Sequence, residues 1–315
     1  MTHEVIELTD TTSGATAAIL PGFGMNCFQF QVPTADGVID VLWSEEGFAN
    51  GKGRASGSGI PILFPFPGRI LKGQLDFRGK VYELQEADGL GNAIHGFVID
   101  RQWRVTNQTA TSVQAEFQLS VDAEELLPSW PADFIIRITY QLQGKQLISK
   151  FVCSNPDSQD LPCGLGTHPY FAVPLDGSNA ADCEIKLPVS SQWELKDLIA
   201  SGNRIDLPQA AQFNRGMKFS ETSFDNVFSG LSFDDDGYCR AAIVDPHSDC
   251  QMLMQFSDAF RECVVYNPPH REAICIEPYT CVPDAQRLAD QGIDAGLRIL
   301  QPGESFSAEV TMGIS

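Results

Sequence analysis

The stretch FIIRITYQL, residues 134–142, alternates apolar and polar side chains along its whole length. Successive side chains of a strand point to opposite faces, so Phe134, Ile136, Ile138, Tyr140 and Leu142 would share one buried face. The stretch therefore predicts a β-strand with one side against a hydrophobic core.

The same alternation occurs in SVQAEFQLSV (112–121), where it predicts that Val121 is buried, and in FSAEVTMGI (306–314). Shorter runs typical of strands are VYELQ (81–85), AAIVD (241–245), MLMQF (252–256), CVVYN (263–267) and AICIE (273–277). Only residues 122–127 and 283–290 suggest helices, and both are short. Strands follow one another without regular βα alternation, so we predict an all-β fold, a large antiparallel β-sandwich, with residues 1–315 forming a single domain.

The chain carries 41 acidic and 21 basic residues, a net charge of −20. Such a surface repels phosphate backbones and anionic lipids, so we expect no nucleic-acid partner and no membrane partner. No apolar run approaches the length of a membrane span, and the N-terminus MTHEVIELTD lacks the features of a signal peptide. Nine cysteines without a C-x-x-C pair predict reduced thiols. We therefore expect a cytoplasmic protein.

Five segments place polar chemistry within apolar or glycine-rich surroundings: IPILFPFPGRI (60–70), NAIHGF (92–97), GLGTHPYF (164–171), SFDNVFSG (223–230) and ICIEPYT (274–280). In ICIEPYT, Glu277 ends an apolar run, and Pro278 predicts that the strand stops there. A carboxylate in such a place costs free energy unless something pairs with it.

Each of these polar residues also has a structural interpretation. Glu277 could form a buried salt bridge, and His168 and His95 could be packed histidines. Arg69 could lie on the surface, and Asp225 could form a turn. Taken one at a time, the residues leave both interpretations open.

Together, and in this order, the segments resemble the aldose 1-epimerase (galactose mutarotase) family. IPILFPFPGRI is similar to its arginine segment, IHGF and THPYF to its two histidine motifs, SFDNVFSGL to its aspartate loop, and CIEPYTCVPDA to its glutamate motif. The resemblance covers about residues 20–315. It implies a concave sheet that holds a sugar, with His168 and Glu277 as catalytic residues and with Arg69, His95 and Asp225 binding the substrate.

The chemistry implied is acid–base ring opening of a free hexose, without a cofactor or metal. A base removes the proton from the anomeric hydroxyl O1, and an acid protonates the ring oxygen O5 from the opposite side of the C1–O5 bond. Glu277 would be the base, and His168, whose ordinary pKa is about 6.5, would be the acid. We expect nearby Glu277 to favour the charged imidazolium of His168.

Three other interpretations stay open. A hexose-6-phosphate 1-epimerase would need a basic pocket; the available cations, scattered in sequence, are Arg78, Lys80, Arg101, Arg104 and Arg271. A non-catalytic sugar-binding protein could use the same fold, and His95, His168 and Glu277 could bind a metal. Phe64, Phe66, Tyr170 and Phe171 could line the sugar site or simply pack in the core. The sugar and the oligomeric state also stay open.

Overall fold

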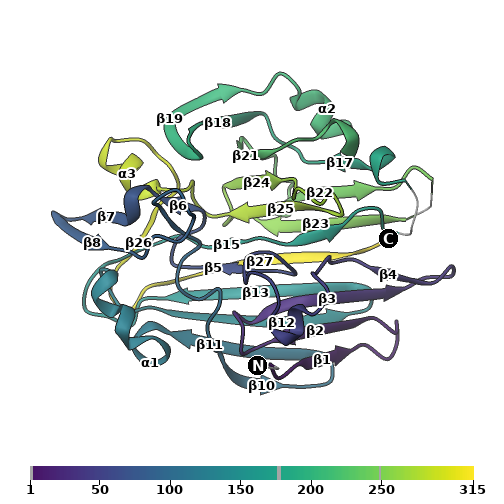
Figure 1. The fold of residues 1–315 in the computed structure, drawn as a ribbon, viewed down its shortest axis with the longest axis horizontal. Coiled ribbons are helices and arrows are strands. Elements are labelled where there is room, and N and C mark those ends of the chain that lie inside the picture. Colours follow the sequence, from purple (N-terminus) through teal and green to yellow (C-terminus); the bar gives the residue numbers. More distant parts are fainter. Residues whose placement is uncertain (1–2, 176–178, 248–249) are drawn as a thin grey trace.

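The computed structural model describes residues 3–175, 179–247 and 250–315. Strands dominate it, and three large sheets account for most of them (Figure 1). Every pair of neighbouring strands within these sheets is antiparallel, as the sequence predicts for a β-sandwich.

The largest sheet has nine strands and contains all three of the long alternating segments. In sheet order the strands are β10 (Arg104–Gln108), β11 (Ser112–Gln118), β12 (Ile135–Gln143), β13 (Gln146–Ser154), β27 (Ser305–Ile314), β23 (Gln251–Ser257), β22 (Tyr238–Val244), β17 (Glu184–Lys186) and β20 (Met217–Lys218). The buried side chains of β12 alternate with more exposed ones, which confirms the pattern in residues 134–142.

The prediction for residues 119–121 is wrong. Strand β11 ends at Gln118, and the helical turn α1 (Leu119–Asp122) leaves the side chain of Val121 exposed. The carboxylate of Asp122 accepts a hydrogen bond from the backbone N–H of Gln118, and the carboxylate of Asp133 accepts one from Ser120. These side chains satisfy backbone groups that a continuing strand would otherwise pair.

A second sheet of eight strands contains the residues predicted to be functional. Its strands are β19 (Ile199–Asp206), β18 (Ser191–Lys196), β21 (Asp225–Ser229), β24 (Glu262–Tyr266), β25 (Ala273–Tyr279), β15 (Gly166–Thr167) and β5 (Ile62–Leu63), with β16 (Tyr170–Ala172) also paired to β25. Strand β25 ends at Tyr279, one residue past Pro278, which confirms the prediction that the strand stops about there. Glu277 and Tyr279, on either side of the proline, still pair with Val264 and Glu262 of β24.

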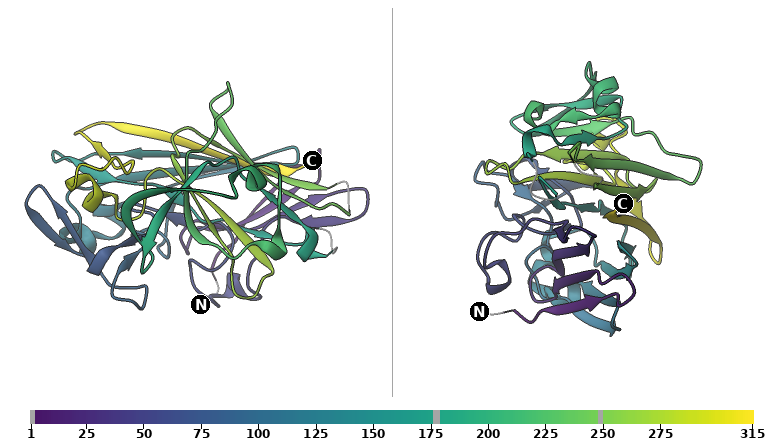
Figure 2. Two further views of the ribbon diagram at one scale, coloured as in Figure 1. Left: turned by 90° about the horizontal axis from the view of Figure 1, so that it is seen from above. Right: turned by 90° about the vertical axis from the view of Figure 1, so that its right-hand side faces the viewer.

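The smaller sheets complete the strand inventory. The N-terminal sheet contains β1 (Ile6–Thr9), β2 (Thr16–Leu20), β3 (Asn26–Pro33) and β4 (Val38–Asp40). The remaining strands form three two-stranded sheets: β6 (Arg69–Ile70) with β9 (Ala93–Ile94), β7 (Gln74–Phe77) with β8 (Lys80–Glu83), and β14 (Leu161–Cys163) with β26 (Arg298–Leu300). The N-terminal strands lie at one end of the molecule, and residues 191–215 lie at the other (Figures 1 and 2).

The hydrophobic core joins the three large sheets. One cluster of buried apolar side chains includes Phe30 of β3, Ile138 of β12 and Val265 of β24. Burial of apolar surface of this kind is the main favourable contribution to folding. Eight of the nine cysteines are buried, and Cys250 is partly exposed.

The helices are short and peripheral (Figure 1). Besides α1 they are α2 (Ala210–Arg215), α3 (Ala285–Asp290) and the 3₁₀ turns Phe48–Asn50, Leu71–Gly73, Glu124–Ser129, Ala180–Asp182 and Phe219–Glu221. The helix predicted at 283–290 corresponds to α3, and the one predicted at 122–127 divides between α1 and the turn that follows it. Among the described residues, no helix has the length and apolar character needed to cross a membrane.

Candidate functional site

A cleft of about 480 Å³ opens over the eight-stranded sheet. Its volume lies in the range of roughly 300–1,000 Å³ typical of small-molecule sites. All five residues predicted from the sequence line it: Arg69, His95, His168, Asp225 and Glu277. The structure thus brings together residues that are more than 200 positions apart, although their roles stay predictions.

The strand register explains why these side chains meet. Asp225 of β21 lies opposite Tyr266 of β24, which lies opposite Cys275 of β25, which in turn lies opposite Tyr170 of β16. Two residues further along each strand, Val264 of β24 lies opposite Glu277 of β25. Since residues two apart on a strand share a face, both rows project from the same side of the sheet.

His168 reaches the same row from the other neighbour of β25. It lies between Gly166, which is opposite Tyr279, and Tyr170, which is opposite Cys275. A Cβ atom at Gly166 would lie 2.7 Å from the ring of Tyr279, so only glycine fits beside that ring. The tyrosine is therefore held against the segment that carries His168.

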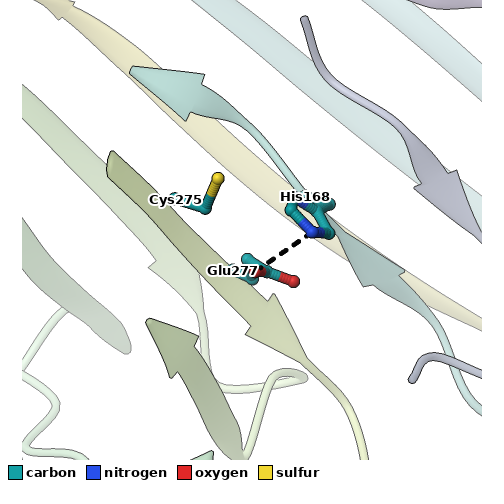
Figure 3. Close-up of side chains that lie close together, drawn as sticks. All are labelled: His168, Cys275 and Glu277. Carbon is teal, nitrogen blue, oxygen red and sulfur yellow. Dashed lines mark ion pairs between the residues drawn. The ribbon is translucent and has the colours of Figure 1, made fainter. Parts of the chain in front are cut away.

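His168 and Glu277 form a buried pair at the floor of the cleft (Figure 3). His168 Nε2 lies 3.3 Å from Glu277 Oε1, and their side chains are only 8% and 2% exposed. Tyr279 Oη donates a 2.8 Å hydrogen bond to Glu277 Oε2. Both carboxylate oxygens of Glu277 thus have a neighbour that fixes the orientation of the group.

Burial disfavours the charged form of both members of this pair. It lowers the pKa of His168 to about 4. It raises the pKa of Glu277 well above the usual value for glutamate, against the hydrogen bond from Tyr279. Burial therefore acts against the expectation that Glu277 keeps His168 charged.

The geometry also corrects the expected placement of acid and base. Two atoms only 3.3 Å apart leave no room for a sugar ring between them. The pair would therefore address a sugar from one side. O1 and O5 are bonded to the same carbon, so two neighbouring proton-transfer groups can each reach one of these oxygens.

His95 lies next to this pair in a constrained loop. The rings of His95 and His168 meet edge to face, with centroids 5.6 Å apart. His95 has a left-handed backbone with φ of 67°, a conformation that costs a non-glycine residue about 1–2 kcal/mol. Burial, followed by the nearby charges of His168 and Arg69, lowers the pKa of His95, and its buried Nδ1 has no hydrogen-bond partner among the described residues.

Arg69 is oriented by a second carboxylate outside the cleft. Its Nε donates to Asp88 Oδ2 at 3.0 Å, and Asp88 itself accepts hydrogen bonds from Asn92 and from the backbone of Leu90. In the described part of the chain, no side chain pairs with the terminal guanidinium nitrogens of Arg69. These nitrogens remain available to hydroxyl groups in the cleft.

Asp225 lies at the exposed edge of the cleft. Partial burial raises its pKa, and the positive charge of Arg69 opposes that effect. A carboxylate in this position can accept hydrogen bonds from hydroxyl groups of a ligand.

Several lining residues were not identified from the sequence. The most informative are Trp43, Arg54, Tyr266, His270 and Tyr279. The sequence pointed to two of them, since Tyr279 is two residues from Glu277 and Tyr266 belongs to the strand-like run CVVYN (263–267). Trp43 and His270 stack with centroids 4.1 Å apart, a contact between distant loops that leaves no local pattern.

The four proposed aromatic wall residues separate into two groups. Tyr170 lines the cleft and stacks on His168 with centroids 4.9 Å apart. Phe64, Phe66 and Phe171 belong to the hydrophobic core. Packing is therefore the correct interpretation for those three.

The cations considered for a phosphate pocket lie outside the cleft lining. Four of them have partners elsewhere: Arg78 pairs with Asp160, Arg101 with Glu125, Arg104 with Glu116 and Asp122, and Arg271 with backbone carbonyls of Phe219 and Thr222. Lys80 lies over the ring of Tyr82. The arginines that line the cleft are Arg54 and Arg69.

The chain is similar to known proteins along most of its length. A family model described as aldose 1-epimerase matches residues 4–313. The chain is 22% identical to the uncharacterized protein YphB of Escherichia coli, over 91% of this chain and 95% of that protein. It is 25% identical to the protein LacX (plasmid) of Lactococcus lactis, over 61% of this chain and 60% of that protein.

Solved structures with the same fold include two close matches in shape. A galactose mutarotase-like protein from Clostridium acetobutylicum has a TM-score of 0.87 at 22% identity, covering 99% of this chain and 98% of its own. A GalM/aldose epimerase homologue from Caenorhabditis elegans has a TM-score of 0.82 at 20% identity, covering 99% of each chain. At these identities the likeness concerns the fold.

Proposed function

The chain belongs to the aldose 1-epimerase family, and from that premise we propose that it interconverts the α and β anomers of a free hexose. The observation that carries the proposal is the direct contact between His168 Nε2 and Glu277 Oε1 at the floor of the cleft. Positioned acids and bases of this kind typically accelerate a proton transfer by about 10²–10⁴-fold.

The reaction requires two proton transfers and no change of redox state. Glu277 removes the proton from O1, and His168 donates a proton to O5 as the C1–O5 bond breaks. The resulting aldehyde rotates about the C1–C2 bond. Closure from the other face of the carbonyl reverses both transfers and gives the opposite anomer.

The proton balance of this cycle fits the buried pair. Before ring opening, Glu277 is ionised and His168 is protonated; in the open form both groups are neutral. The pair therefore holds one proton in both states, and only its location changes. Burial favours the neutral state of both groups, and the charge of Asp225 adds to this effect at Glu277. The hydrogen bond from Tyr279 and the charge of Arg69 oppose it by favouring ionised Glu277.

The remaining cleft residues suit sugar binding. Arg69 offers fixed donors, Asp225 offers an acceptor, and His95 is placed beside His168 to donate to O5 or to a neighbouring hydroxyl. Tyr170 and Tyr266 supply aromatic surface next to these polar groups. This mixture of polar groups and aromatic rings matches the chemistry of a pyranose.

The test is polarimetry on freshly dissolved α-D-glucose and α-D-galactose in weak buffer near pH 7. The proposal predicts a faster decay of optical rotation with the protein than with buffer for at least one of these sugars. Glucose 6-phosphate, followed by NMR exchange, is the comparison substrate. Catalysis of the phosphorylated sugar alone would replace the free-hexose proposal, and catalysis of neither would favour a sugar-binding role.

A further inference from the structure

We infer that His168 and Glu277 at the floor of the cleft, together with the neighbouring buried Cys275, also form a site for a divalent cation, with Zn²⁺ as the ion that fits best. Their potential ligand atoms all lie within 4.8 Å of one another (Figure 3). Bonds from Zn²⁺ to nitrogen, oxygen or sulfur are about 2.0–2.3 Å long, so ligand atoms in a tetrahedral site lie about 3.3–3.8 Å apart. Small side-chain adjustments would therefore close the site.

The sheet holds these three residues close together before any ion arrives. Cys275 and Glu277 are two residues apart on β25 and share a face. His168 lies on the neighbouring segment, level with Glu277 between the paired positions Gly166 and Tyr170. Ligands carried by paired strands need less ordering on binding than ligands carried by loops.

The donor set selects the kind of ion. One imidazole, one thiolate and one carboxylate with an open fourth position is a combination suited to Zn²⁺. Mg²⁺ and Ca²⁺ prefer oxygen ligands and are disfavoured by the thiol and the imidazole. His95, considered from the sequence as a third ligand, is not a member of this group.

Charge balance supports the site despite its burial. All three residues are buried, and Cys275 has no exposed surface. Binding releases into solvent both the thiol proton and the one proton held by the His168–Glu277 pair, and it forms Zn–S, Zn–N and Zn–O bonds. One thiolate and one carboxylate then neutralise the two positive charges of the ion, which lowers the cost of placing it in a buried site.

Under the proposed function, on which this consequence rests, the ion would inhibit the protein. It would engage the His168 nitrogen and the Glu277 oxygen that the sugar needs for proton transfer. The inference therefore concerns an inhibitor and not a cofactor, and it agrees with a reaction that proceeds without metal.

The experiment titrates the EDTA-treated, dialysed full chain with zinc chloride in a calorimeter and with cobalt(II) chloride in a spectrophotometer. Wild type should bind one equivalent of Zn²⁺, and its Co²⁺ complex should show thiolate-to-cobalt charge-transfer absorption. Cys275→Ala should lose that absorption and weaken Zn²⁺ binding by at least about 100-fold, the upper end of what loss of an outer-shell partner costs. Cys275→Ser, closer in size to the native residue, should behave in the same way.

Cys263→Ala is the matched control, because Cys263 is equally buried on the adjacent strand β24 but projects from the opposite face. It should keep both the absorption and the affinity. Absence of the charge-transfer band in wild type, or wild-type affinity in Cys275→Ala, would overturn the inference.

Anomer exchange measured in EDTA separates this inference from the proposed function. Lack of activity in EDTA refutes the proposed function and leaves the binding result unaffected. Activity in EDTA that one bound equivalent of Zn²⁺ does not abolish refutes inhibition at this site.

Discussion

Strands β12 and β25 are both interior strands of antiparallel sheets, but they bury different chemistry. The buried side chains of β12 are Ile136, Ile138, Tyr140 and Leu142. All seven residues of β25 are buried, and these include Cys275, Glu277 and Tyr279. Both segments look like core strands in the sequence, and only the second contains an ionisable carboxylate.

The contrast extends to the sheets around these strands. Among the described residues of the nine-stranded sheet, no carboxylate is buried, and the buried hydroxyls are those of Tyr140, Ser149 and Thr311. The eight-stranded sheet buries Glu262 and Glu277, with His168 beside them. Burying a charge costs free energy that a hydrophobic residue would not. The nine-stranded sheet therefore serves as a scaffold, and the polar face of the other sheet is better explained by a chemical role.

The largest expected effect comes from Glu277→Gln. The change keeps the shape of the side chain but removes the proposed base, so kcat/KM for a free hexose should fall by about 10²–10⁴-fold. The free energy of unfolding should change by less than about 1 kcal/mol, because a costly buried carboxylate is replaced by a neutral amide. Polarimetry measures kcat/KM, and urea denaturation measures the free energy of unfolding. Near-normal activity of Glu277→Gln would contradict a chemical role for the buried carboxylate of the eight-stranded sheet.

Ile138→Ala is the corresponding change in the scaffold. It leaves a cavity beneath β12 and should lower the free energy of unfolding by about 2–5 kcal/mol. Activity per folded molecule should stay at the wild-type value, since Ile138 is remote from the cleft lining. Urea denaturation checks the first expectation, and a loss of activity larger than the unfolded fraction explains would argue against the separation of scaffold and site.

Tyr279→Phe tests the hydrogen bond that orients Glu277. Hydrogen bonds to charged groups contribute about 1.5–3 kcal/mol, so kcat/KM should fall by about one to two orders of magnitude. The matched control is Tyr238→Phe, which removes a 3.0 Å hydrogen bond to Glu309 on the nine-stranded sheet. Steady-state kinetics should show a loss for Tyr279→Phe and none for Tyr238→Phe; equal behaviour of the two variants would contradict the positioning role.

The smallest effect concerns an exposed ion pair. The hydrogen bond from Arg261, followed by that from the Gly296 backbone, lowers the pKa of Asp294 to about 2. A lowered pKa in the folded state stabilises the protein above the unfolded value near 3.9, and this contribution disappears as the pH falls toward 2. Because Asp294 is exposed, Asp294→Asn should cost less than about 1 kcal/mol at pH 7.

Urea denaturation at several pH values checks this expectation. The difference between wild type and Asp294→Asn should shrink between pH 5 and pH 2. If Asp294→Asn lowered the free energy of unfolding equally at pH 2, the ion pair would not explain the effect. If it lowered that free energy by more than Ile138→Ala does, exposed charges would contribute more to stability than the packing of the sheets.

Alternation made the strands predictable, and it failed where side chains compete for the backbone. Strands β12 and β27 of the nine-stranded sheet follow directly from period-two patterns. At residues 119–121, the carboxylates of Asp122 and Asp133 capture backbone N–H groups, and the pattern of the sequence contains no sign of that competition.

The candidate site was predictable as a set of residues but not as a geometry. The motifs around His168 and Glu277 predicted these two residues. The 3.3 Å contact between them and the directions of both pKa shifts depend on burial between strands, which the motifs do not contain. Tyr279 belongs to the motif ICIEPYT. Its hydrogen bond to Glu277 could not be predicted from that motif, because it depends on the strand register that aligns Tyr279 with Gly166.

The most direct test of the central claim is a double-mutant cycle on anomer exchange, measured by NMR with wild type, His168→Ala, Glu277→Gln and the double variant. If the buried pair acts as one unit, each single change should lower the rate by about 10²–10⁴-fold, and the double change should be little worse than the more damaging single one. A single variant that keeps the wild-type rate, or losses that multiply in the double variant, would contradict the account.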